Sequence, residues 1–216
     1  MEFRRILSLV FLWQLAASIC YYTVFAATPF FRDEFALSGA EVGLVLTALS
    51  LGYAAFLLPL GAMTDRFGER RMLTVGLLGL SVGSVLVAGA WSYPTLLVGT
   101  FLLGSLYGTA MPGTNKAIFD NVPVGRQNLA VGIKQVGVTA GSGVSALLVT
   151  SIAGVLFWEA GFYVAAVVGL AIAAIFWLAY RGQPVDGDAE YPEFRSLLDN
   201  TPYLSLTVAG VCLGAG

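Results

Sequence analysis

Apolar residues run through this sequence in long, nearly uninterrupted segments, separated by short polar stretches. Crossing the hydrocarbon core of a bilayer as a helix takes about 20 apolar residues, and about six segments meet that test. They cover roughly residues 6–28, 41–62, 72–90, 95–117, 129–153 and 161–180. None of them shows the period-two alternation over about 10 residues that a membrane β-barrel strand requires. The pattern therefore predicts an all-α polytopic membrane protein.

Composition agrees with this prediction and narrows the possible functions. Hydrophobic residues make up 57% of the 216 residues, and charged residues only 11%, against about 25% in average soluble domains. The net charge of −2 argues against nucleic-acid binding. The chain has no histidine, the commonest metal ligand and general base near neutral pH. Cys20 and Cys212 lie in separate apolar runs and form no disulfide or metal framework, so we predict no metal and no cofactor.

The basic residues indicate how the chain is oriented. Lysines and arginines gather on the cytoplasmic side of membrane proteins. If the N-terminus is cytoplasmic, the inner side holds Arg4, Arg5, Arg66, Arg70, Arg71, Lys116, Arg126, Arg181 and Arg195. The outer side holds Arg32, and Lys134 lies within a span. The sequence therefore predicts a multi-pass protein of the cytoplasmic membrane with its N-terminus inside the cell.

The order of apolar and polar segments also predicts domains. Residues 1–180 form a six-helix transmembrane domain, and the polar residues 181–201 form a cytoplasmic linker. Residues 202–216 are apolar again, but at 1.5 Å per residue they reach only about 22 Å, short of the roughly 30 Å core. We therefore expect a chain that is truncated in its seventh span.

Spacing favours an internal repeat. The first and fourth spans begin near residues 6 and 95, and the third and sixth near residues 72 and 161, an offset of about 89 in both cases. Inverted repeats of three helices are common in transporter halves. Small residues at Gly104/Gly108 and Gly137/Gly141/Ser145 predict close helix packing. Gly113 after Pro112 predicts a break near the inner end of the fourth span.

The polar loop between the second and third spans carries a distinct motif, Gly-Ala-Met-Thr-Asp-Arg-Phe-Gly-Glu-Arg-Arg-Met-Leu, over residues 61–73. Gly61 allows close helix contact and Gly68 permits a tight turn. Asp65 can accept backbone N–H groups at a helix N-terminus, and the arginines can pair with carboxylates or lipid phosphate. The alternative is an ordinary loop that follows the positive-inside rule.

This loop, in its place between spans two and three, resembles the signature loop of the major facilitator superfamily. The resemblance implies the N-terminal six-helix half of a transporter, with two inverted three-helix repeats and the start of a seventh span. It also implies that the loop holds the two halves together on the cytoplasmic side when the transporter opens outward. The residues concerned are Gly61, Asp65, Arg66, Gly68, Arg70, Arg71 and Asp120.

The roles within this motif also come from the resemblance. Asp65 would face a helix N-terminus in the second half, and Arg70 or Arg71 would pair with Asp120 at the inner end of span four. Glu69 stands where the family usually has a basic residue.

Two departures from family patterns weaken a drug-efflux function. Span four has Thr100-Phe101 where many proton-coupled members carry an arginine, and the span-five segment 137–143 lacks the proline of drug antiporters. Residues 132–137, Gly-Ile-Lys-Gln-Val-Gly, instead resemble the start of span five in prokaryotic facilitators for small anions or organic solutes.

Polar side chains within the spans are the candidate solute contacts. In span one, Gln14, Ser18, Tyr21 and Tyr22 share one helical face. The full candidate set is Gln14, Ser18, Tyr21, Tyr22, Tyr107, Lys134, Gln135 and Thr139. Interhelical hydrogen bonding without a solute is the alternative for the polar groups. Lys134 could extend to the interface or pair with Asp120, or it could attract an anionic solute into a cavity.

The leading hypothesis is secondary active transport of a small solute by alternating access. Its partners are the solute, the bilayer and a C-terminal six-helix half. The alternatives are a truncated fragment that needs that half and transports nothing alone, and a membrane-embedded enzyme. An enzyme would need paired acids, a nucleophile with its base, or a metal set, and we find no catalytic residues in the spans.

Overall fold

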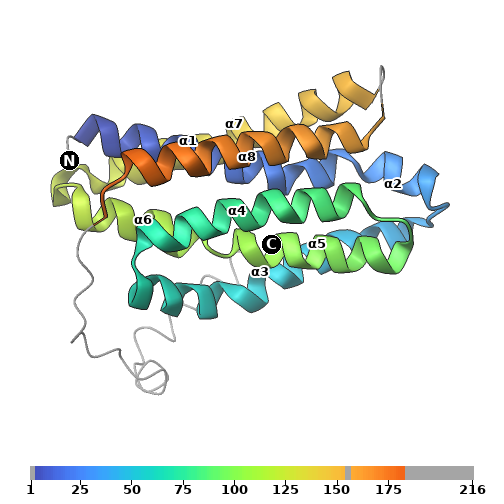
Figure 1. Ribbon diagram of the computed structural model, residues 1–216, viewed down its shortest axis with the longest axis horizontal. Helices are drawn as coiled ribbons and strands as arrows, with labels where there is room; N and C mark the ends of the chain where they lie inside the picture. Colours follow the sequence, from blue (N-terminus) through green and yellow to red (C-terminus); the bar gives the residue numbers. More distant parts are fainter. Residues whose placement is uncertain (1–2, 154–156, 183–216) are drawn as a thin grey trace. The chain divides into compact units, whose positions relative to one another are not determined.

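The computed structural model describes residues 3–153 and 157–182. The predictions for residues 202–216, and for the linker after residue 182, lie outside the described residues. The described chain contains eight helices and no strand (Figure 1): α1 (Phe3–Ala26), α2 (Thr28–Glu34), α3 (Gly39–Phe67), α4 (Glu69–Ala88), α5 (Tyr93–Tyr107), α6 (Ala110–Asn121), α7 (Val124–Ala153) and α8 (Glu159–Ala179). The predicted all-α architecture is confirmed.

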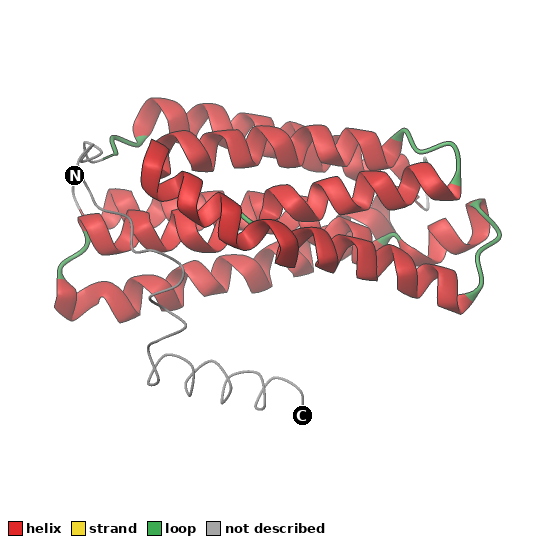
Figure 2. Cartoon of the chain, turned by 90° about the horizontal axis from the view of Figure 1, so that it is seen from below, coloured by secondary structure: helices red, strands yellow, loops and turns green. Residues whose placement is uncertain are grey.

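The predicted spans correspond to the long helices of the bundle, which run side by side in Figure 2. Within the described residues, α1, α3, α4, α8 and the α5–α6 stretch are long and apolar enough to cross a membrane. Helix α7 has 30 residues and covers the predicted fifth span. Of the five stretches, α1 is the most buried and α3 the least. Helix α1 is therefore central, while most of the apolar surface of α3 is exposed within the described residues.

Three helix pairs make the most extensive contacts: α1 with α7, α3 with α5, and α4 with α8. If spans one, two and three are exchanged with spans four, five and six, the same three pairs result. Inverted repeats require this symmetry. Ser18 and Tyr107 are 89 residues apart in the sequence, and their hydroxyl oxygens lie 3.2 Å apart. Since 89 is also the repeat offset, equivalent positions of the two repeats meet at the centre of the bundle.

Glycines set the distance between these paired helices. A Cβ on Gly104 would collide with the Leu49 carbonyl, and one on Gly141 would lie 2.8 Å from the Leu15 carbonyl. The predicted close packing is confirmed at these positions. At Gly61 a Cβ would meet only Pro112 Cβ among the described residues, at an ordinary 3.7 Å, so close helix contact there stays a prediction.

The turn between α3 and α4 consists of Gly68 alone. Its φ of 82° lies in the region that glycine adopts without steric cost, so the predicted role of Gly68 is confirmed. The predicted loop was too long, because α3 continues to Phe67 and the Gly68 N–H still donates to the Thr64 carbonyl. Asp65 and Arg66 are therefore helical.

Two other boundaries differ from the predictions. The stretch Phe31–Glu34, predicted as polar loop, belongs to the short helix α2, which has a proline in its first turn. The break in span four lies at Gly108-Thr109, ahead of Pro112. A proline has no N–H for the carbonyl four residues earlier, so the helix is interrupted one turn before Pro112.

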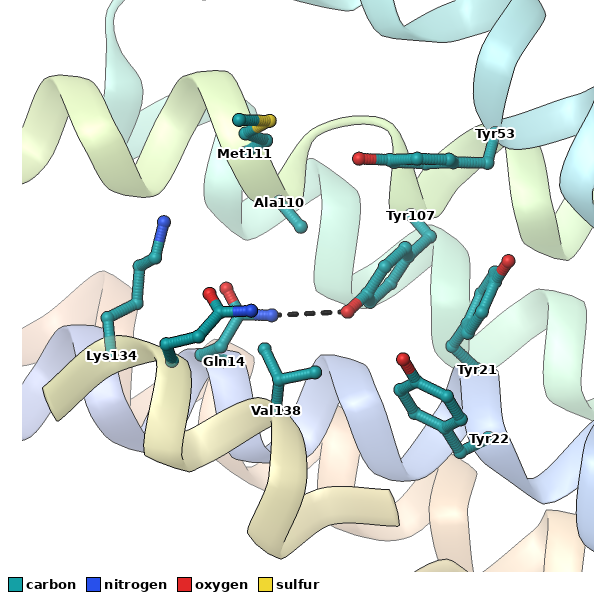
Figure 3. Close-up of a pocket in the computed structure, with 10 residues that line it drawn as sticks. Gln14, Tyr21, Tyr22, Tyr53, Tyr107, Ala110, Met111, Lys134 and Val138 are labelled. Atoms are coloured by element: carbon teal, nitrogen blue, oxygen red, sulfur yellow. Dashed lines mark hydrogen bonds between the residues drawn. The ribbon is translucent and has the colours of Figure 1, made fainter. Parts of the chain in front are cut away.

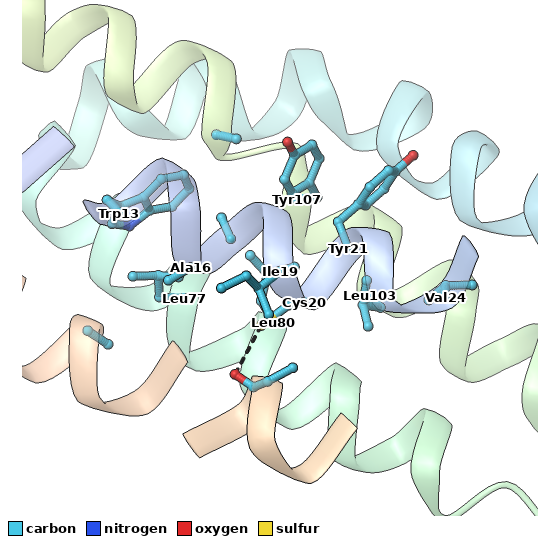
Figure 4. Packing of buried hydrophobic residues seen from close by; sticks show 14 of the residues in the cluster. Trp13, Ala16, Ile19, Cys20, Tyr21, Val24, Leu77, Leu80, Leu103 and Tyr107 are labelled. Atoms are coloured by element: carbon cyan, nitrogen blue, oxygen red, sulfur yellow. Dashed lines mark hydrogen bonds between the residues drawn. The ribbon is translucent and has the colours of Figure 1, made fainter. Parts of the chain in front are cut away.

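The core is built around α1. Trp13 is fully buried, and its Nε1 donates to the Leu73 carbonyl at 2.8 Å, which ties α1 to α4. Leu77 and Leu80 of α4 lie beside α1 in Figure 4, which also shows the Cys20 thiol bonded to a carbonyl of α8. This packing fixes the rotation of α1, so its polar face turns away from α4 and α8.

Candidate functional site

A cleft of about 280 Å³ opens on the polar face of α1 (Figure 3). Helices α1, α3, α5, α6 and α7 contribute to it. Its lining residues are Gln14, Tyr21, Tyr22, Tyr53, Tyr107, Ala110, Met111, Lys134, Gln135 and Val138. Four of the six spans thus meet around one space, which is the arrangement of a solute site between helices.

The structure brings together most of the candidates named from sequence. Six of the eight line the cleft: Gln14, Tyr21, Tyr22, Tyr107, Lys134 and Gln135. Ser18 lies directly behind them, fully buried against Tyr107. Thr139 is exposed on α7 and is not among the lining residues.

A hydrogen-bonded group joins α1 to α5 at the base of the cleft. Gln14 Nε2 donates to Tyr107 Oη at 3.3 Å and to Ser18 Oγ at 3.4 Å. Gln14 and Ser18 are both buried. These bonds connect helices, as the alternative interpretation expected, and they also hold the Tyr107 hydroxyl at the edge of the cleft.

Four tyrosine rings form one wall of the cleft, which we call the tyrosine wall: Tyr21, Tyr22, Tyr53 and Tyr107. Tyr21 stacks on Tyr107 with 4.2 Å between ring centroids, and Tyr53 lies 5.6 Å from Tyr107. Sequence reasoning missed Tyr53. The available signal was that Tyr53 is the sole tyrosine in the apolar segment 41–62.

Lys134 lies inside the bundle rather than at its surface. It is the eleventh residue of α7, about 15 Å along the helix, and only 5% exposed. Its Nζ donates to Asn115 Oδ1 of α6 at 2.7 Å. Among the described residues it forms no ion pair with a carboxylate; Asp120 pairs instead with Lys116, at 3.0 Å. Pairing with Asp120 is therefore wrong, and the burial of Lys134 argues against extension to the interface.

The signature motif lies at the junction of α3 and α4. Asp65, Arg66 and Arg71 are exposed there. The expected ion pair between Arg70 or Arg71 and Asp120 is absent from the described residues, because Lys116, one turn earlier on the same helix, is nearer to Asp120. Arg70 instead donates to the Trp177 carbonyl at 2.6 Å and lies 4.2 Å from the Trp177 ring centroid.

The surroundings of Glu69 explain why an acidic residue stands where the family usually has a basic one. It is only 1% exposed and accepts a hydrogen bond from Tyr180 Oη at 3.0 Å, while Asn121 Nδ2 donates to Tyr180 Oη at 3.1 Å. Tyr180 Oη thus accepts from Asn121 and donates to Glu69 at the same time. We call Glu69, Asn121 and Tyr180 the end cluster. They join the start of α4 to the ends of α6 and α8.

Relatives are found among bacterial transporters. The chain is 28% identical to a hexuronate transporter of Bacillus subtilis, covering 79% of this chain and 40% of that protein. It is 30% identical to a probable sulfoacetate transporter of Cupriavidus necator (83% and 42%) and 27% identical to a gallate transporter of Pseudomonas putida (69% and 33%). The chain thus spans less than half the length of these relatives.

Solved structures and a family model agree on the fold. A bacterial homologue of the human lysosomal transporter Spinster, inward-facing and unoccupied, superposes with a TM-score of 0.75 at 20% identity, over 93% of this chain and 48% of that one. The POT family transporter PepTSo also reaches a TM-score of 0.75, at 19% identity, over 89% of this chain and 41% of that one. The model of the Major Facilitator Superfamily matches residues 10–216. The chain belongs to the major facilitator superfamily.

Proposed function

We propose that this chain supplies one half of a secondary transporter for a small anion, with the solute held in the α1–α3–α5–α6–α7 cleft. Buried Lys134 at the edge of that cleft is the observation that carries the proposal. Three relatives are named for the transport of hexuronate, sulfoacetate and gallate, and all three solutes are anions.

The surroundings of Lys134 argue for a negatively charged solute. A lysine costs about 2.5–3.5 kcal/mol at the centre of a span and less near its ends, so a buried lysine in a span favours a functional role. An ammonium has three N–H donors, and Asn115 is the acceptor that the structure provides. Asn115 is neutral, which leaves the charge of Lys134 uncompensated among the described residues. A carboxylate or sulfonate in the cleft would accept charge-assisted hydrogen bonds from the remaining donors.

Transport would follow from alternating access between two six-helix halves. Asp65 is exposed on the last turn of α3, where it is free to meet a helix N-terminus of the second half. A carboxylate at such a terminus contributes about 0.3–2 kcal/mol. Asp65→Asn should therefore reduce the outward-open population of the complete transporter, measured by labelling from the cytoplasmic side. Unchanged labelling would argue against this contact.

Membrane orientation is part of the same proposal. The uneven distribution of basic residues favours a cytoplasmic α3–α4 junction and an external α2. In sealed cells, a membrane-impermeant maleimide should label Asp33→Cys and leave Arg71→Cys unlabelled; both positions are exposed. Labelling of Arg71→Cys from outside would reverse the orientation.

Uptake by the complete transporter tests the proposed function. Cells producing it, with wild-type residue 134 or Lys134→Gln, are supplied with labelled glucuronate, sulfoacetate or gallate. Loss of a charge-assisted hydrogen bond worth about 1.5–3 kcal/mol raises the apparent KM about 10–150-fold. Lys116→Gln is the matched control, because Lys116 is adjacent to Asn115 but pairs with Asp120 outside the cleft. Equal KM values for wild type and Lys134→Gln would refute the proposal.

A further inference from the structure

The cleft has two chemically different ends. Figure 3 shows Lys134 on one side of Gln14 and Val138, and Tyr21 and Tyr53 on the other. The Lys134 end is cationic, while the other end is the tyrosine wall. A solute that fills the cleft must match both ends at once.

The size of the cleft argues against the smallest anions as well-fitting occupants. Its volume of about 280 Å³ is much larger than one small oxyanion. A single oxyanion beside Lys134 would leave most of that volume, including the tyrosine wall, filled with water. The space fits an organic molecule with an anionic group at one end and a larger body at the other.

The tyrosine wall indicates the shape of that body. Tyr22 and Tyr53 are only partly buried, so part of each ring remains available to a solute. Aromatic rings favour stacked or edge-to-face contact with a second ring at centroid distances of about 4.5–7 Å. The hydroxyls of the four tyrosines and the amide of Gln135 supply hydrogen-bonding groups around that surface. A flat ring with polar substituents matches this combination better than an open aliphatic chain.

We propose that the cleft selects cyclic carboxylates: the carboxylate binds Lys134 and the six-membered ring packs against the tyrosine wall. This inference rests on the proposed anion transport and adds a second recognition element to it. Asn115 acts as a positioning residue, because its bond to Nζ at 2.7 Å fixes where the ammonium lies. Tyr22 and Tyr53 decide between ring-bearing and open-chain anions.

A matched ligand series tests the selectivity on the purified complete transporter in detergent. Calorimetry would compare benzoate, 4-hydroxybenzoate and cyclohexanecarboxylate with acetate and inorganic phosphate, and with benzamide as the uncharged analogue of benzoate. We expect the three ring carboxylates to bind at least tenfold more tightly than acetate or phosphate, and 4-hydroxybenzoate to bind most tightly. Benzamide should bind at least tenfold more weakly than benzoate.

Variants separate the two ends of the cleft. Tyr53→Leu should weaken benzoate binding at least fivefold and leave acetate unchanged, while Tyr53→Phe keeps the preference for a ring. Lys134→Gln should weaken both anions. Tyr93→Leu is the control, since Tyr93 bonds the Glu41 carbonyl outside the cleft.

The outcomes distinguish this inference from the proposed function. If acetate and benzoate bind equally and both require Lys134, anion binding stands and selection for a ring is wrong. If no anion binds in a way that depends on Lys134, both are wrong. The wild-type ligand series decides the question even where a leucine variant fails to fold.

Discussion

Lys134 and Glu69 are both buried charges of this chain, but their surroundings are opposite. Glu69 is 1% exposed and hydrogen-bonded by Tyr180, whose hydroxyl is in turn bonded by Asn121. Lys134 is 5% exposed, bonded to a neutral amide, and adjacent to an open cleft. In the end cluster, the protein's own side chains bind the buried carboxylate. At the cleft, the Lys134 ammonium still has room for a solute to bind it.

Under the proposed function, this difference separates a structural charge from a solute-binding one. A buried charge whose hydrogen-bonding capacity is met stabilises one particular packing, and removing its partner is costly. A buried charge beside a cleft lowers the stability of the empty protein, because its desolvation is not repaid until a ligand binds. Substitutions at the two places should therefore change stability in opposite directions.

The largest effect is expected at the glycine that holds α3 against α5, on which half of the tyrosine wall depends. In Gly104→Ala the new methyl group would collide with the Leu49 backbone carbonyl, which cannot move as a side chain can. We expect a loss of about 3 kcal/mol of stability, seen as a lower melting temperature in detergent. Gly132→Ala is the control, since nothing lies within 4 Å of its Cβ position. Equal melting temperatures would show that the two helices separate easily.

Lys134→Met tests the cleft side of the comparison directly. Anion affinity should fall about 10–150-fold with the loss of a charge-assisted hydrogen bond. The melting temperature of the empty protein should rise, because an uncompensated buried charge is replaced by an apolar side chain of similar length. Lys116→Met serves as the control. A lower melting temperature would mean that Lys134 is structural, like Glu69.

Asn115→Asp should give the Lys134 ammonium a counter-ion within the protein. The new carboxylate would lie within reach of Nζ, which Asn115 Oδ1 already approaches to 2.7 Å. With an internal counter-ion, we expect anion affinity to fall about tenfold and thermal stability to increase. Asn115→Ala would instead lower affinity about 2–12-fold with no gain in stability, since a neutral hydrogen bond contributes about 0.5–1.5 kcal/mol. Unchanged affinity in Asn115→Asp would contradict a role for Lys134 charge in binding.

The smallest effect is expected in the end cluster. Tyr180→Phe removes a donor to buried Glu69 and should cost about 1–2 kcal/mol, measured by thermal unfolding, with anion affinity unchanged. Tyr163→Phe is the control, because Tyr163 is exposed on α8, the helix that Tyr180 follows. A change in anion affinity in Tyr180→Phe would connect the end cluster to the cleft. The distinction between Glu69 as a structural charge and Lys134 as a binding charge would then fail.

Much of the architecture could be predicted from local sequence. Spans are long apolar runs, and their existence depends on the residues within each run. The Gly68 turn and the common face of Gln14, Ser18 and Tyr21 could also be predicted, because a backbone conformation and a helical face are local properties. The break before Pro112 was placed a few residues too late, since the missing N–H acts on the preceding turn.

Contacts between helices were predicted poorly. The expected partner of Asp120 was an arginine of the α3–α4 motif, but Lys116 on its own helix pairs with it. The end cluster around Glu69 was not anticipated either. In each case the residues on both sides were visible in the sequence, but the rotation and crossing of their helices were not.

The sequence by itself determined which segments are helical, where the chain turns at Gly68, and that a polar stripe follows α1, because hydrophobicity, chain stiffness and helical periodicity act over a few residues. Only the tertiary structure decided that Tyr53 joins Tyr107 and that Asn115 meets Lys134. Those pairings depend on how closely α3 approaches α5 and on how α6 faces α7. Backbone contacts at glycines such as Gly104 set such distances, and they join residues far apart in the chain, so no local pattern encodes them.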